Sequence, residues 1–172
     1  MIEPEWARIA GLHVTEEGSV GVVWVALNPQ NNTLTIYDCS IFDREVLAVI
    51  AEGLKGKDTW IPVAWPKSAQ ELSKKLLDRG CKMLYEACDE SQASIEITSR
   101  EIEERMRTKK LKVGKELKPW LDEYKTYYRQ DSQIPKNSHP LMAATRNAIS
   151  RLDSAKKKNK SQILNYPKIN VL

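Results

Sequence analysis

The side chains in this sequence that could do chemistry are two histidines, three cysteines and a set of acids near expected strand ends. His13 and His139 are far apart in the chain, and no Ser or Cys stands in a nucleophile-elbow motif. Two imidazoles and a cysteine could bind zinc, but histidines so distant in sequence are usually structural or exposed. Because Asp and Glu are normally exposed, we expect the acids to have solvated surface roles. They are Glu16, Glu17, Asp38, Asp43, Asp89, Glu90 and Glu123.

A basic stretch in the second half of the chain is the candidate for nucleic-acid binding. Residues 1–99 contain 9 Lys and Arg against 15 Asp and Glu, whereas residues 100–172 contain 18 against 8, so the halves carry formal charges of −6 and +10. On one face, the basic side chains would neutralise several phosphates of duplex DNA without reading bases. The alternative is a solvated lysine-rich turn, and both interpretations remain open. The stretch consists of Arg105, Arg107, Lys109, Lys110, Lys112, Lys115 and Lys118.

Composition indicates one compact domain and a tail. The chain has 172 residues, 41% of them hydrophobic and 29% charged, which suits a globular protein with a single core. We expect the domain to span residues 1–155 and a basic, polar tail to span residues 156–172, with its lysines mainly aiding solubility. No apolar run approaches the roughly 18 residues of a membrane helix. With no targeting signal at the amino terminus and no C-x-x-C pair, we expect a cytoplasmic protein with reduced thiols.

The opening of the sequence predicts three strands and a helix. β-Branched and aromatic residues at 8–14, 20–27 and 33–41 predict a three-stranded antiparallel meander. Apolar residues at helical spacing over 43–54 predict the helix that follows.

The middle of the sequence predicts further strands around a second helix. The apolar segment 59–66 predicts a buried central strand, and 82–88 is expected to be another strand. Between them, Ser68 and Glu71 form a capping-box pattern for a helix that ends near Gly80.

The second half is predicted to be helical around the basic stretch. Thr98 and Glu101 form a second capping-box pattern, which predicts a helix through Met106. Two further helices are expected over 119–129 and 141–152, and prolines suit their first turns. The element order describes an α/β fold with a mixed sheet and helices on its faces. Four aromatic residues have spacings that favour packing in a core over stacking on bases, namely Trp120, Tyr124, Tyr127 and Tyr128.

Four strings in this order resemble the carboxy-terminal nuclease domain of the large terminase subunit of tailed bacteriophages. The family opens with a Pro-Trp approach and a strand that ends in a glycine and an aspartate, and residues 4–13 resemble this opening. Its Ala-Trp-Pro-His-Asp-Gly strand end resembles residues 64–69. Its Gly-Arg-x-Lys-Val string and Trp-x-x-Glu-x-x-x-Tyr helix resemble 110–113 and 120–128. Its final aspartates and Leu-Met-x-Ala-Thr-Arg helix resemble 139–148.

The resemblance implies a ribonuclease-H-like fold and a two-metal nuclease site whose acids are replaced. At the three metal-ligand positions of the family, this chain has His13, Ser68 and the pair His139-Pro140. The family would use magnesium or manganese, which need oxygen ligands, chiefly carboxylates, so we expect no metal cofactor and no enzymatic activity here. The family's ATPase motor has no counterpart, because no G-x-x-x-x-G-K-[ST] string occurs in the chain.

Three functions therefore remain in contention. The first is a non-catalytic module of viral DNA packaging that binds duplex DNA. The second is a protein-interaction module or regulator that docks on terminase, portal or procapsid components. The third and weakest is a metal-dependent endonuclease whose acidic ligands have been relocated. Each would place a phage- or prophage-encoded protein in the cytoplasm of the bacterium or host cell.

Overall fold

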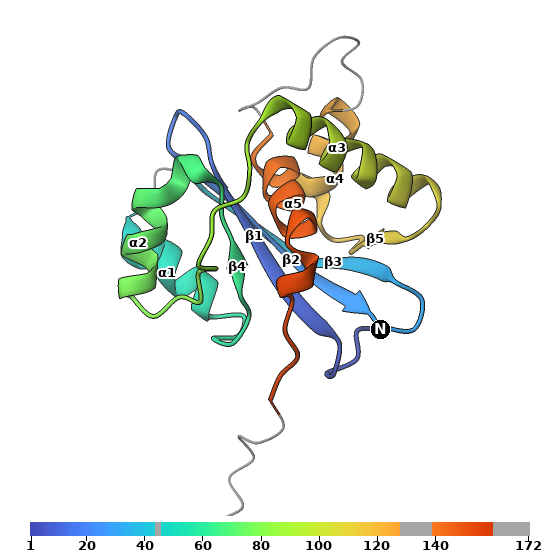
Figure 1. Ribbon diagram of the computed structural model, residues 1–172, viewed down its shortest axis with the longest axis horizontal. Helices are drawn as coiled ribbons and strands as arrows, with labels where there is room; N and C mark the ends of the chain where they lie inside the picture. The colour runs from blue at the N-terminus through green and yellow to red at the C-terminus, as the bar shows by residue number, and fades with distance from the viewer. Residues whose placement is uncertain (44–45, 128–138, 160–172) are drawn as a thin grey trace, which may run out of the picture.

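A computed structural model describes residues 1–43, 46–127 and 139–159 and shows a five-stranded mixed sheet with helices on both faces (Figure 1). The strand order is β4-β1-β2-β3-β5. The first three strands form the expected antiparallel meander, while β4 runs parallel to β1 and β5 runs parallel to β3. The expected α/β fold with a mixed sheet is confirmed. The strands are β1 (Ala7–Val14), β2 (Ser19–Asn28), β3 (Thr33–Asp43), β4 (Val63–Ala64) and β5 (Leu111–Val113).

Two helical layers cover the sheet. One core cluster joins the sheet to α1 and α2, and the other joins it to α3, α4 and α5. In Figure 1, α5 crosses the sheet near its centre, over β1 and β2. No helix in the described ranges is long and apolar enough to cross a membrane. The helices are α1 (Leu47–Lys55), α2 (Gln70–Asp78), α3 (Gln92–Arg107), α4 (Lys118–Tyr127) and α5 (Pro140–Ser150), with short 3-10 turns at 67–69 and 152–154.

Strand β2 shows why the central strands have nearly continuous apolar sequences. Val22 and Trp24 belong to the core cluster under α1 and α2, whereas Val23 and Val25 belong to the cluster under α3, α4 and α5. Successive side chains of a strand point to opposite faces, so a strand covered on both faces must be apolar at nearly every position. The sequence of β2 therefore suits an inner strand.

Two glycines let α5 approach the sheet closely. A Cβ on Gly11 of β1 would lie 1.9 Å from the carbonyl oxygen of Ala144, and one on Gly21 of β2 would lie 2.7 Å from the backbone of Pro140. Side chains do not tolerate such contacts, so only glycine permits this helix position. The start of α5 is thereby fixed above Gly21.

The capping box predicted for α2 was wrong. Ala69 is the N-cap residue of this helix, and no side chain caps it. The hydroxyl of Ser68 binds the carboxylate of Glu90 instead. The Ser68 hydroxyl therefore binds Glu90, which is distant in sequence, and does not cap the helix as the local pattern predicted.

The capping box predicted for α3 was also wrong, because Thr98 lies inside the helix. The helix begins at Gln92, and the Oγ of its N-cap residue Ser91 accepts from the backbone N of Ser94 at 3.2 Å. The Thr98 hydroxyl donates to the carbonyl oxygen of Ser94 at 2.8 Å, one turn back. Threonine can satisfy its hydroxyl within a helix, so its presence did not mark a boundary.

Two predicted strands are shorter than expected. The segment 59–66 contributes only the two residues of β4. The segment 82–88 contributes only isolated bridges, from Met83 to Val63 and from Cys88 to Pro66. The apolar composition of these segments therefore indicated that they are buried, and not that they form long hydrogen-bonded strands.

The basic stretch contains a strand that the sequence did not predict. Strand β5 places Leu111 beside Leu34 of β3. Leu111 is buried in the core, so it attaches this otherwise polar segment to the sheet.

Several sequence predictions include residues outside the described ranges, and the helix expected over 43–54 is one of them, because residues 44 and 45 are not described. The helix expected over 119–129 corresponds to α4, which is described as far as Tyr127. Of the tail expected over 156–172, residues 160–172 lie outside the described ranges. The boundary proposed at 155 therefore stays a prediction.

Candidate functional site

His13 stands on β1 at the place where α5 begins. In the sheet it lies opposite Gly21, the glycine against which Pro140 packs. The His13 side chain is only 5% exposed, and its buried Nε2 has no hydrogen-bond partner among the described residues. Burial, with a smaller effect of the Arg146 guanidinium, lowers the pKa of His13 to about 4. The imidazole is therefore neutral at pH 7.

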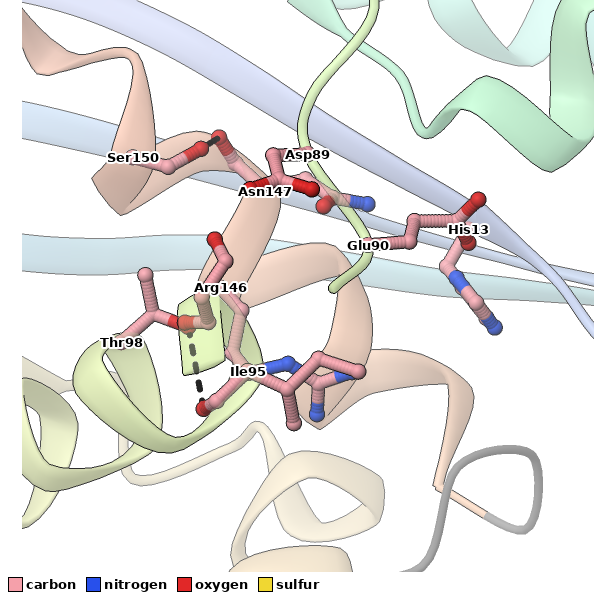
Figure 2. A pocket seen from close by; sticks show the side chains of 9 residues that line it. His13, Asp89, Glu90, Ile95, Thr98, Arg146, Asn147 and Ser150 are labelled. Carbon is pink, nitrogen blue, oxygen red and sulfur yellow. Dashed lines mark hydrogen bonds between the residues drawn. The ribbon is translucent and has the colours of Figure 1, made fainter. Parts of the chain in front are cut away.

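Ser68 is linked to the same region through Glu90. The Ser68 hydroxyl donates to Oε1 of Glu90, and its backbone N donates to Oε2, both at 2.8 Å. Glu90 in turn lines a pocket together with His13, and Figure 2 shows these two side chains beside each other. The first two metal-ligand positions of the resemblance thus lie on either side of one carboxylate.

The His139 side chain belongs to a different set of contacts. Its Nε2 is 2.8 Å from the hydroxyl of Thr126, and its ring packs edge-on against Tyr127 with centroids 5.4 Å apart. Burial, followed by the Arg146 charge, lowers the pKa of His139. The structure therefore brings Pro140 to the sheet near His13, while it turns the His139 imidazole toward α4.

The pocket beside His13 has a volume of about 220 Å³ and mixed charge. It lies between β1, α3, α5 and the segment before α3 (Figure 2). A neutral imidazole, two carboxylates and a guanidinium are gathered in this small space. Its lining residues are His13, Asp89, Glu90, Ser94, Ile95, Thr98, Arg146, Asn147 and Ser150.

Arg146 is the charged residue of this pocket that the sequence analysis did not propose as a site residue. It is 6% exposed, and its Nη1 donates to the hydroxyl of Tyr127 at 2.9 Å. The Tyr127 hydroxyl is also 2.7 Å from the Oγ of Ser99 on α3. A buried arginine must be hydrogen-bonded, and this chain of contacts joins α3, α4 and α5. One feature of the sequence could have indicated that Arg146 is buried. It lies in an expected helix among predominantly small and apolar residues.

Glu123 also differs from expectation, because it is half-buried rather than fully solvated. Its carboxylate accepts from the backbone N of Leu141 at 2.9 Å and from that of Met142 at 3.1 Å, so it satisfies the first free N–H groups of α5. Burial raises the pKa of Glu123 to about 7, although the two backbone hydrogen bonds act in the opposite direction. Its structural role is to attach α4 to the start of α5.

Two acids on β3 have local roles near the surface. Asp38 forms an ion pair with Lys57. Asp43 accepts from the hydroxyl of Ser19 at 3.0 Å. Neither lines the pocket beside His13.

The remaining acids lie in loops. Asp89 accepts from the backbone N of Ser91 at 2.8 Å and from its hydroxyl at 2.9 Å, and these bonds lower the pKa of Asp89. Glu16 and Glu17 are exposed between β1 and β2, as expected. Of all these acids, only Asp89 and Glu90 line the pocket.

These residues do not fit a pair of hard divalent cations. Within 1–43, 46–127 and 139–159, no group of three or more His, Cys, Asp or Glu side chains is placed to hold a metal ion. Two magnesium or manganese ions about 4 Å apart require several convergent carboxylates. The pocket beside His13 offers two, together with the guanidinium of Arg146, which repels cations.

The basic stretch runs from the end of α3 through β5 to the start of α4, at the edge of the sheet opposite β4. Its two arginines pair within α3, Arg105 with Glu101 at 2.9 Å and Arg107 with Glu104 at 2.6 Å. These guanidinium charges are therefore partly neutralised by the helix itself.

The lysines of this stretch have no carboxylate partner within the described part of the chain. One of them, Lys110, donates to the carbonyl oxygen of Asn31 at 2.8 Å. The lysines, rather than the arginines, are thus the charges available to a polyanion. The exposed lysines are Lys109, Lys110, Lys112, Lys115 and Lys118.

The aromatic residues of α4 pack against the core, as the sequence predicted. Trp120 is fully buried and donates from its indole N to the Thr145 hydroxyl at 2.9 Å. Tyr124 stacks on Trp120 with ring centroids 5.5 Å apart, and Tyr127 is buried. Tyr128 lies outside the described residues.

Comparison with solved structures identifies the fold. The nuclease domain of the P22 large terminase superposes with a TM-score of 0.79 and 18% identity, over 91% of this chain and 86% of that one. The manganese-bound nuclease domain of the large terminase from the bacteriophage SPP1 gives 0.63 and 18%, over 84% and 86%. The manganese-soaked terminase nuclease domain of human cytomegalovirus gives 0.56 and 11%, over 90% and 89%.

The chain therefore has the ribonuclease-H-like fold of a large terminase nuclease domain. The similarity covers most of this chain and most of each of these domains. No protein-family model and no curated protein matches the sequence.

Proposed function

We propose that this chain is a catalytically degenerate nuclease-like domain associated with viral DNA packaging, which binds the duplex DNA backbone without reading sequence. The observation that carries the proposal is the composition of the three positions that the resemblance aligns with metal ligands of the family. This chain has His13, Ser68 and His139-Pro140 there, and none of these side chains is a carboxylate. The fold and the order of its motifs support the link to packaging, and we expect the protein to act in the cytoplasm.

Loss of catalysis is tested with plasmid DNA. In magnesium or manganese the purified chain should leave supercoiled plasmid intact, because hard cations find too few oxygen ligands at the pocket. Titration calorimetry should detect no tight binding of either ion. Metal-dependent nicking that persists through purification and disappears in a Glu90→Gln variant would instead establish the relocated-ligand endonuclease.

That alternative has one specific observation in its favour. The Glu90 carboxylate is held by Ser68, which stands at a metal-ligand position of the resemblance, and it lines the pocket with Asp89. Glu90 thus supplies an acid close to a position where the family has one. Two metal ions would still need more convergent carboxylates than the two that this pocket offers.

Duplex binding is attributed to the lysines at the β5 edge. If about four phosphates are neutralised, a plot of log affinity against log salt should have a slope near −3.6, from roughly −0.9 per contact. Replacing Lys109, Lys110 and Lys112 together with Gln should flatten the slope by nearly three units without loss of the fold. Duplexes of unrelated sequence should bind equally.

Docking on terminase, portal or procapsid components is the second candidate function. Absence of duplex binding even at about 50 mM salt would favour it, because phosphate contacts are strongest at low salt. Analytical ultracentrifugation of the same purified chain with those proteins would then show complex formation.

A further inference from the structure

A second basic region lies at the β4 edge of the sheet, away from β5. A groove of about 540 Å³, here called the β4-edge groove, opens beside β4. The lysines at 156–158, expected from sequence to aid solubility, gather here with Lys82 and two aromatic side chains. The groove is lined by Thr59, Trp60, Pro62, Lys82, Met83, Leu84, Tyr85, Lys156, Lys157, Lys158 and Asn159.

Backbone hydrogen bonds hold both lysine-bearing segments in place. The backbone N of Arg8 in β1 donates to the carbonyl oxygen of Lys156 at 2.8 Å, and the backbone N of Lys156 donates to that of Arg8 at 3.0 Å. The backbone N of Val63 in β4 donates to the carbonyl oxygen of Lys82 at 2.8 Å. Lys82 and Lys156 are thus carried by backbone that pairs with the sheet, and Lys157 and Lys158 follow directly after Lys156.

The charge of the β4-edge groove is not compensated locally. None of its lining residues is acidic, and the acids nearest in sequence, Asp58 and Glu86, are not among them. In the part of the chain that the structure describes, no ion pair involves Lys82 or the lysines at 156–158. Four like charges around one groove repel one another, and a bound polyanion would remove this repulsion.

Two aromatic side chains give the β4-edge groove a second means of binding a ligand, in addition to its positive charge. Tyr85 is 99% exposed, so its ring is accessible to a planar group that could stack on it. Trp60 also lines the groove, and its buried indole Nε1 has no hydrogen-bond partner among the described residues. An unpaired buried donor is costly, and a small shift on binding would let it donate to an acceptor on a ligand.

We propose that the β4-edge groove binds a single-stranded polynucleotide, with phosphates on the lysines and a base stacked on Tyr85. A basic groove combined with exposed aromatic rings is the combination that binds single strands. The bases of a duplex are stacked inside it and cannot reach such a ring, and an acidic peptide would use the lysines but leave the ring unused. The proposal is independent of duplex binding at the β5 edge.

The test measures binding of the full chain to a fluorescent oligo-dT of about 12 nucleotides, which lies within the usual site size for single strands. Tyr85→Ala should weaken binding about tenfold, whereas Tyr85→Phe, which keeps the ring, should bind like the parent. Replacing Lys156, Lys157 and Lys158 with Gln should flatten the salt slope by about two units, from roughly −0.7 per contact on single strands.

Matched controls separate this site from other binding. Ile97→Ala removes an exposed apolar side chain on α3 and should not change affinity. The triple variant at Lys109, Lys110 and Lys112 should lose duplex binding but keep oligo-dT binding, and the triple variant at 156–158 should do the reverse.

Three outcomes would overturn the proposal. The first is a lack of oligo-dT binding by the parent chain, and the second is equal weakening by Ile97→Ala and Tyr85→Ala. The third is full competition of a poly-Glu peptide with oligo-dT, together with an equal loss of affinity for both ligands in Tyr85→Ala. Such a site would recognise charge without a base.

Discussion

The pocket beside His13 and the β5 edge accommodate charged residues in opposite ways. In the pocket, Arg146 is buried and hydrogen-bonded, and the His13 imidazole is buried and neutral at pH 7. At the β5 edge, Lys109 and Lys112 are exposed and their charges remain in water. Buried polar groups contribute to the fold through fixed partners, whereas exposed charges contribute little to it and remain available for binding. Substitutions in the pocket should therefore change stability, and those at the edge should change affinity.

The largest effect is expected at Gly11, beneath the middle of α5. Gly11→Ala should destabilise the protein by about 3 kcal/mol or more, because its Cβ would lie 1.9 Å from the carbonyl oxygen of Ala144 and α5 would have to move. Gly18→Ala is the matched control, since Gly18 has a φ of +89° but nothing lies within 4 Å of the added Cβ. It should cost only about 1 kcal/mol. Urea unfolding measures both, and equal losses would show that α5 is not seated on Gly11.

The next effect is a pH dependence in which buried His13 and half-buried Glu123 oppose each other. The pKa of His13 is lowered from 6.5 to about 4, so its contribution to stability is present above pH 6.5 and is lost as the pH falls toward 4, by about 3 kcal/mol in full. The pKa of Glu123 is raised from 4.5 to about 7, so its contribution is present below pH 4.5 and is lost as the pH rises toward 7. Their sum should vary little across this range.

Single variants should expose the two opposed slopes. In His13→Gln, stability should fall as the pH rises from about 4.5 to 7, and in Glu123→Gln it should fall as the pH drops from about 6.5 to 4. Urea unfolding at a series of pH values measures both profiles. Two variants with the same profile as the parent would contradict the burial of both groups.

A smaller effect separates lysines from arginines at the β5 edge. Replacing Lys109 and Lys112 with Gln should flatten the salt slope of duplex binding by about 1.8 units. Replacing Arg105 and Arg107 with Gln should flatten it much less, because both guanidinium groups already pair with glutamates of α3. Fluorescence anisotropy across a salt series distinguishes the two variants, and equal slopes would mean that these ion pairs open on DNA.

The smallest effect is expected for the stability of Arg107→Gln. The ion pair of Arg107 with Glu104 is exposed, and such pairs contribute little to stability. The variant should have the same urea midpoint as the parent within the error of the measurement. A clear loss of stability would mean that Arg107 makes a stabilising contact besides this exposed ion pair.

The sequence by itself determined the elements with strong periodic patterns. The meander of β1, β2 and β3 follows from alternating and continuous apolar runs, and α5 follows from an apolar segment that begins with a proline. The motif order was sufficient to indicate the fold of a terminase nuclease domain. The sequence also determined that His13, Ser68 and His139 are not carboxylates, which no tertiary contact can change.

Tertiary structure decided the short strands and the helix starts. Val63 of β4 pairs beside Ala10, and Leu111 of β5 pairs beside Leu34, so each short strand depends on a partner distant in sequence. Likewise, the hydroxyl of Ser68 binds a carboxylate 22 residues away instead of capping the helix that follows it. Local patterns cannot encode such partners.

Tertiary structure also decided which charged groups are buried and which gather at one surface. Arg146 is buried and Glu123 is half-buried because helices from separate segments meet around them, and only that meeting supplies their hydrogen-bond partners. The lysines at 156–158 lie in one groove with Tyr85 because the backbone of Lys156 pairs with Arg8, near the opposite end of the chain. Spacing along the chain carries no information about a contact of this range, because it forms only when the sheet and its helices have assembled.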